Sequence, residues 1–182
     1  TAAGREFRDG GGVSPDIEVK QERLPNILYY LVRDNLIFDY ATDYCLKHPV
    51  IASAEKFELT DADYTDFKNK VKGADFKYDQ QSEKILKTLK EAAEFEGYMK
   101  EASDEFKALE NKLSHNLDRD LDYFSKDIKE MISEEIIKRY YYQRGAIIQQ
   151  LKGDNELDEA VKILTNPERY QQILSVTATE KK

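Results

Sequence analysis

The sequence predicts an all-α fold of about six helices, and three observations lead to that prediction. Four of the eight glycines fall within the first twelve residues, and the rest of the chain is almost free of Gly and Pro. Apolar residues then recur every three or four positions, which is the period of an amphipathic helix. The composition, 40% hydrophobic and 35% charged, is too apolar for a disordered chain.

The first predicted helix spans residues 24–47, with a break at Asp34-Asn35 and an end at His48-Pro49, because the residue before a proline avoids helical geometry. Its apolar stripe consists of Leu24, Ile27, Leu28, Leu31, Val32, Ile37, Phe38, Ala41 and Cys45.

A second helix is predicted to begin at Thr60, a good N-cap residue, with Asp63 in the position of a capping box. Leu59 precedes the cap and is expected to pack against Tyr64 as a hydrophobic staple. Gly73 is expected to close the helix.

Two long helices are predicted next. One runs from Asp79 or Ser82 to residue 113, with a bend at Gly97, since glycine weakens a helix interior by roughly 1 kcal/mol relative to alanine. The other begins near Leu117. The short turn at residues 114–116 predicts a long antiparallel helical hairpin between them.

The C-terminal part is predicted to hold two short helices. Asp154 caps the first, and Asn166-Pro167 places an N-cap and a first-turn proline at the start of the second. We therefore divide the chain into a terminal strand segment at 1–22, a helical domain at 23–176 and a disordered tail at 177–182.

The N-terminal segment contains Gly10-Gly11-Gly12, which permits positive φ or close backbone approach. A phosphate loop is disfavoured, because no Lys-Ser or Lys-Thr follows. Residues 16–20 alternate charged and β-branched side chains, which predicts a short extended or β segment. A flexible terminal tail is the alternative interpretation.

The same segment resembles the end of the catalytic core of C-terminal processing peptidases, also called tail-specific proteases. The family pattern is a Thr-x-x-Gly-Arg strand followed by a Gly-Ile-x-Pro-Asp turn, and Ala2 stands where the family often has proline. The matching positions are Thr1, Gly4, Arg5, Gly12, Val13, Pro15 and Asp16.

The resemblance implies a serine endopeptidase with a Ser-Lys dyad, which cleaves protein substrates near their C-termini in the periplasm or cell envelope. The dyad would precede Thr1, so this chain would lack the catalytic residues and need no cofactor. Its expected partners are the upstream peptidase and PDZ domains and protein or peptide substrates, and self-association stays open. A structural, substrate-gating or assembly role is expected. The competing interpretation is a stand-alone helical adaptor.

The densest aromatic and basic run predicts an interaction surface formed by Tyr140, Tyr141, Tyr142 and Arg144. Successive helical residues point about 100° apart, so we expect some of these tyrosines to fill the core instead.

Other constellations favour structural interpretations. Ser114, His115 and Asp118 are near in sequence, but a catalytic triad requires convergence in a pocket. The acidic run at 154–159 lacks the glycine and final glutamate of a calcium loop. The Ser-Lys pairs Ser82/Lys84 and Ser125/Lys126 lie on predicted exposed faces, where lysine cannot act as a base.

The remaining function classes are limited by composition. A net charge of −8 disfavours a nucleic-acid surface. Cys45 is the only cysteine, which excludes an internal disulfide and a cysteine-based metal site. With one cysteine and no calcium loop, no metal site is predicted. No apolar run approaches the length of a membrane span.

Overall fold

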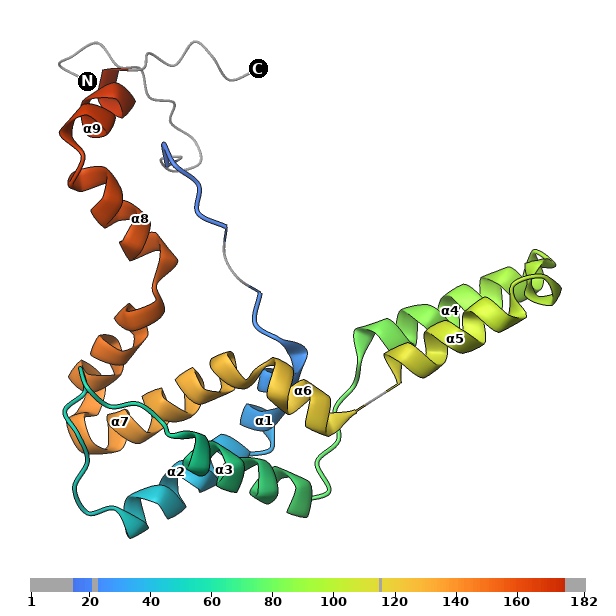
Figure 1. Cartoon of the computed structure of the whole chain (residues 1–182), viewed down its shortest axis with the longest axis horizontal. Helices are drawn as coiled ribbons and strands as arrows, with labels where there is room; N and C mark the ends of the chain where they lie inside the picture. Colours follow the sequence, from blue (N-terminus) through green and yellow to red (C-terminus); the bar gives the residue numbers. More distant parts are fainter. Residues whose placement is uncertain (1–14, 21–22, 115, 176–182) are drawn as a thin grey trace. The chain divides into compact units, whose positions relative to one another are not determined.

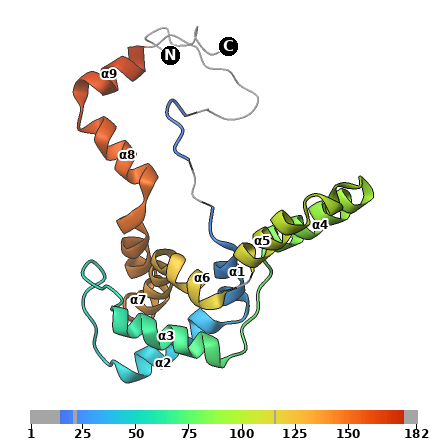
Figure 2. The same ribbon diagram turned by 45° about the vertical axis from the view of Figure 1, so that its right-hand side comes forward.

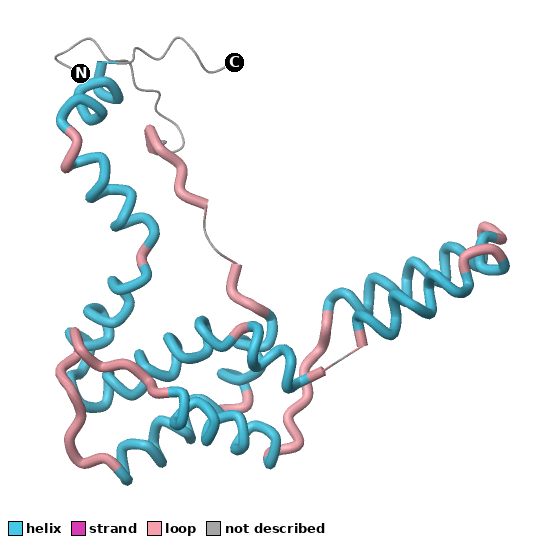
Figure 3. Tube along the Cα trace, viewed as in Figure 1, coloured by secondary structure: helices cyan, strands magenta, loops and turns pink. Residues whose placement is uncertain are grey.

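The computed structural model describes residues 15–20, 23–114 and 116–175. Helices dominate these ranges, as Figures 1 and 3 show. The chain divides into two compact units. The larger spans Leu24–Gln149, and the described part of the smaller comprises residues 15–20, 23 and 150–175.

The all-α prediction is confirmed, but the described ranges contain nine α-helices rather than about six. The extra helices arise where predicted long helices break. They are α1 (Asn26–Arg33), α2 (Leu36–Lys47), α3 (Asp61–Gly73), α4 (Gln81–Phe95), α5 (Ser103–Leu113), α6 (Leu117–Tyr123), α7 (Ser125–Gln150), α8 (Asn155–Leu164) and α9 (Pro167–Ser175), with short 3-10 turns η1 (Tyr98–Lys100) and η2 (Leu151–Gly153).

The break between α1 and α2 lies at Asp34-Asn35, as predicted. Asn35 adopts the left-handed conformation, with φ of 58°, which asparagine tolerates better than most residues. Helix α3 begins at the predicted capping box: the Asp63 amide donates to the Thr60 hydroxyl at 3.1 Å, and the Thr60 amide donates to the Asp63 carboxylate at 3.2 Å.

A helical hairpin is present, but it is not the predicted one, which joined a helix ending at residue 113 to a helix beginning near Leu117. Figures 1 and 2 show α4 and α5 side by side, and the chain reverses between them through η1. Gly97 takes a φ of 85°, a left-handed conformation that terminates a helix. The expected bend is therefore the reversal itself, and the segment after residue 116 is instead broken into α6 and α7.

The predicted strand is not found in the described part of the N-terminal segment. Residues 15–20 have neither helical nor strand hydrogen bonding, and the rest of the segment lies outside the described residues. A strand needs a neighbouring strand to pair its backbone groups, and the described ranges offer none.

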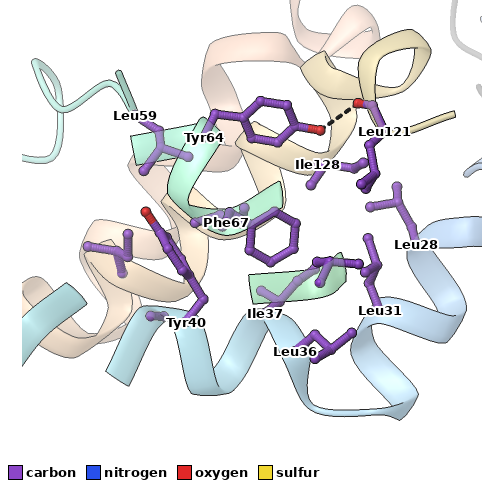
Figure 4. Packing of buried hydrophobic residues seen from close by; sticks show 14 of the residues in the cluster. Leu28, Leu31, Leu36, Ile37, Tyr40, Leu59, Tyr64, Phe67, Leu121 and Ile128 are labelled. Atoms are coloured by element: carbon purple, nitrogen blue, oxygen red, sulfur yellow. Dashed lines mark hydrogen bonds between the residues drawn. The ribbon is translucent and has the colours of Figure 1, made fainter. Parts of the chain in front are cut away.

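The core of the larger unit is built from the apolar faces of α1, α2, α3, α6 and α7. Phe67, in the middle of α3, is fully buried. Its ring packs edge-on against the Tyr40 ring, with 5.3 Å between the centroids. Figure 4 shows Tyr64 reaching Leu121, whose carbonyl accepts a hydrogen bond from the phenol at 2.6 Å. These contacts join α3 to both α2 and α6.

Ion pairs and one arginine connect the same helices at the surface. Lys129 of α7 lies 2.5 Å from Asp61 of α3, and Lys68 of α3 lies 2.7 Å from Asp122 of α6. Arg139 of α7 donates to the Phe38 carbonyl of α2 at 3.1 Å. Exposed pairs of this kind contribute about 0–1 kcal/mol each, so the buried apolar side chains dominate the stability of the unit.

Candidate functional site

A pocket of about 290 Å³ lies between α2 and α3. Helix α2 contributes residues spaced by three and four, which places them on one face, and α3 does the same. The lining consists of Tyr40, Asp43, Tyr44, Lys47, His48, Asp63, Asp66 and Lys70. The loop between the two helices lets these faces meet.

One wall of the pocket is aromatic. The rings of Tyr44 and His48 stack at 4.0 Å between centroids, and the Tyr40 hydroxyl donates to the Asp63 carbonyl at 2.6 Å. Burial, with a smaller contribution from the Asp63 and Asp66 charges, raises the pKa of Tyr40 above its usual range. Its phenol therefore stays protonated and remains a hydrogen-bond donor.

The charged wall is largely paired. Lys70 lies 2.5 Å from Asp43, and this hydrogen bond lowers the pKa of the Asp43 carboxyl. Asp63 is occupied by the capping box of α3. The lining contains no Ser, Thr or Cys side chain, and its tyrosines, carboxylates and lysines can bind polar or charged groups.

A second polar cluster lies where the connector after α3 meets α6. The Asp120 carboxylate, only 7% exposed, accepts hydrogen bonds from the Tyr78 hydroxyl and from the Gln80 amide, the latter at 2.8 Å. Burial, followed by the bond to Asp120, raises the pKa of Tyr78. The cluster fixes the connector to α6 and is satisfied internally, which gives it a structural role.

Sequence reasoning missed both polar sites, although each has a recognisable signal. Asp120 lies among the apolar positions Leu117, Leu121 and Phe124 of the inward stripe. A carboxylate buried there needs hydrogen-bond partners. For the pocket, the signal is the set of polar residues at positions 40, 43, 44 and 47, which share one face of α2. Only the fold shows that this face lies against α3.

The predicted tyrosine surface is distributed over several environments. Tyr140 is half-buried and donates to the His48 carbonyl, and Tyr141 donates to the Ala52 carbonyl at 3.1 Å. Tyr142 is 78% exposed, and Arg144 is exposed as well. Two tyrosines therefore attach α7 to the loop after α2, and an interaction surface at Tyr142 and Arg144 stays a prediction.

The residue pairs that could imitate a catalytic dyad do not line the α2–α3 pocket. The Lys84 ammonium pairs with Asp79 at 2.5 Å, and Lys126 lies on an exposed face 3.9 Å from Glu130. His115 lies outside the described residues. The acidic run at 154 acts as a cap, because Asp154 accepts hydrogen bonds from the Glu156 and Leu157 amides at 2.9 Å.

Most positions of the peptidase motif lie outside the described residues, namely Thr1, Gly4, Arg5, Gly12 and Val13. Pro15 and Asp16 are described and exposed.

Within residues 15–20, 23–114 and 116–175, no group of three or more acidic, His or Cys side chains could hold a metal ion. None of the helices described is long and apolar enough to span a membrane.

A protein-family profile matches residues 27–164, from the first turn of α1 to the end of α8. The family is described as "probable PDZ-protease, C-terminal helical domain". The chain belongs to this family. The match confirms that the chain is the C-terminal helical part of a PDZ-protease, which agrees with the peptidase resemblance of the N-terminal motif.

The helical domain of the PDZ-protease thus includes both the α2–α3 pocket and the α4–α5 hairpin, since both lie within the matched residues. Neither the comparison with curated proteins nor the comparison with solved structures found a match.

Proposed function

We propose that the parent protein is a serine endopeptidase of the C-terminal processing type, active in the periplasm or cell envelope. In this proposal the helical domain is a non-catalytic part that packs against the peptidase and PDZ domains of the same polypeptide. The family description supports a protease parent, and the N-terminal motif supports the processing type.

The observation that carries the proposed packing role is the apolar face of α8 and α9. Both helices are amphipathic and contact each other, yet their large apolar side chains are between 39% and 66% exposed. These residues are Leu157, Val161, Leu164, Tyr170 and Leu174. A sustained apolar stripe of this kind marks an interaction site.

The other domains of the protease are the occupants that we assign to this face. They belong to the same polypeptide, so their effective concentration near α8 and α9 is high, on the order of millimolar for a short linker. Covering the stripe would couple the position of the helical domain to the catalytic core and thereby to substrate access.

The test uses the full-length protease. Val161→Ser with Leu164→Ser should lower the melting temperature and the rate of cleavage of a protein substrate with a recognised C-terminal tail. Lys162→Ser, an exposed change between these positions, should leave both unchanged. Equal activity and stability of the double variant would contradict the packing role.

The serine mechanism is tested separately. Replacing the serine of the dyad that the family resemblance places upstream of Thr1 should abolish cleavage while the helical domain stays folded by circular dichroism. Retained cleavage, or loss of cleavage with a metal chelator alone, would contradict it.

A further inference from the structure

The hairpin formed by α4, η1 and α5, residues 81–113, is here called the arm. Leu86 and Ala93 of α4 are buried, but Ile85, Leu89 and Leu109 are 59%, 51% and 41% exposed. Ile85 and Leu89 are four residues apart and therefore share one stripe of α4. A hairpin of two helices has only one inner seam, so a second stripe needs further helices to cover it.

The charges of the arm are separated along its length. The tip, residues 94–105, has five acidic residues and one lysine, for a net charge of −4. The root, residues 81–93 and 106–113, has five lysines and three glutamates, for a net charge of +2. Within the root, Lys90 bridges to Glu110 at 2.8 Å, which fixes the pairing of α4 with α5.

Most of these charges have no ion-pair partner in the part of the chain that the structure describes. This holds for the acidic residues of the tip and, in the root, for Lys87, Lys107 and Lys112. Helix α4 has 15 residues and is about 22 Å long, which exceeds the Debye length of about 8 Å in physiological salt. Charges at the far end of the tip are therefore largely screened from the lysines at the start of α4.

We propose that the arm is a self-association surface, on which the arms of two copies of this chain pack antiparallel into a four-helix bundle. The acidic tip of each copy then lies beside the basic root of the other, and Ile85 and Leu89 become buried. The arrangement has two-fold symmetry and closes on itself, as most dimers do. A parallel pair would instead place two acidic tips together.

A second copy fits this surface better than the rest of the same chain does. The chain has a net charge of −8 and the arm contributes −2, so the residues outside the arm carry −6. That acidic remainder repels the tip. The root of another arm supplies the opposite charge, and its stripe of Ile85 and Leu89 would face the exposed Phe95 and Tyr98 of the tip. This inference does not depend on the proposed function.

Sedimentation velocity of the full 182-residue chain tests the association. The chain should be a dimer whose dissociation constant rises with salt. Lys87→Glu with Lys112→Glu at the root, or Glu96→Lys with Glu101→Lys at the tip, should weaken it by about tenfold or more. Combining both reversals in one chain should restore the dimer, because the opposite charges again face each other.

Two further variants separate the arm from other surfaces. Leu89→Ser should also weaken the dimer, and circular dichroism should show unchanged helix content because this side chain is half exposed. The matched control, Lys56→Glu with Lys126→Glu, changes two exposed lysines outside the arm and should have no effect. A monomer at every concentration, or a dimer indifferent to the arm variants, would overturn the proposal.

Crosslinking tests the orientation. In a Cys45→Ser background, chains with Glu96→Cys at the tip are mixed with chains carrying Lys87→Cys at the root, and the mixture is oxidised. Disulfide-linked pairs of a tip variant with a root variant are expected. Predominant tip-to-tip pairs would contradict the antiparallel arrangement.

Discussion

At the residue scale, the sharpest local feature is the corner inside α7. Tyr142 has φ of 55° and ψ of −156°, a conformation that is ordinarily restricted to glycine. Three residues later, Gly145 is buried, and a Cβ atom there would lie 2.4 Å from the Tyr141 Cβ and 2.8 Å from the Ile137 Cγ2. The chain therefore turns at Tyr142. At Gly145 the backbone packs directly against the side chains of Tyr141 and Ile137.

Replacing Tyr142 by glycine should relieve this strain. The Tyr142 side chain is 78% exposed, so little packing is lost, while a non-glycine residue in this conformation costs on the order of 1–3 kcal/mol. Urea denaturation should show Tyr142→Gly to be more stable than Tyr142→Ala. In a regular helix the order is the reverse, by about 1 kcal/mol, so a less stable glycine variant would contradict the strained corner.

Gly145→Ala should have the opposite effect. The added methyl group would overlap Tyr141 and Ile137, and overpacking of this kind costs about 1–3 kcal/mol. The matched control is Gly73→Ala at the end of α3, where no atom lies within 4 Å of the new Cβ. Thermal unfolding should show a lower melting temperature for the first variant only, and equal shifts would exclude the close contact.

At the element scale, three helix starts follow a local capping rule that the sequence already displays. Thr60 with Asp63, Asp154, and Asn166 before Pro167 all begin helices at the predicted positions. Capping depends on neighbours within four residues, which is why sequence reasoning located these ends. The position of the hairpin turn depended on whether Gly97 bends or reverses the chain, and the local pattern is compatible with both.

The capping box predicts a measurable contribution to α3. Thr60→Ala removes the hydroxyl that accepts from the Asp63 amide and should lower the free energy of unfolding by about 1 kcal/mol. Thr60→Ser keeps the hydroxyl and should stay close to the parent chain. Chemical denaturation of both variants checks this, and a loss of equal size in the serine variant would argue against the cap.

At the scale of the whole molecule, buried tyrosines link stability to alkaline pH. Burial raises the pKa of Tyr40, Tyr64 and Tyr78 well above the ordinary value of 10.0. The pKa of each phenol is higher in the folded protein than in the unfolded chain. Above about pH 10 the folded protein therefore holds more protons than the unfolded chain does. The stability is therefore complete below about pH 10 and falls as the pH rises further.

This dependence can be measured as the melting temperature between about pH 8 and about pH 11. A decline should set in near pH 10. Tyr64→Phe should reduce the slope of that decline, because one buried phenol no longer titrates. The variant also loses the bond to Leu121 and should start from a lower melting temperature. A flat profile above pH 10 would contradict the effect of burial.

The sequence by itself determined the all-α class, the helix caps and the kinship with a processing protease, because each rests on residues that are close together in the chain. The tertiary structure decided which helices pair, where α7 turns, and which side chains meet in the α2–α3 pocket. These depend on contacts between distant segments: Tyr40 meets Asp63, and Tyr78 meets Asp120, only after the core has formed. Helical periodicity shows that a face is apolar, but the partner that covers it is chosen by the fold.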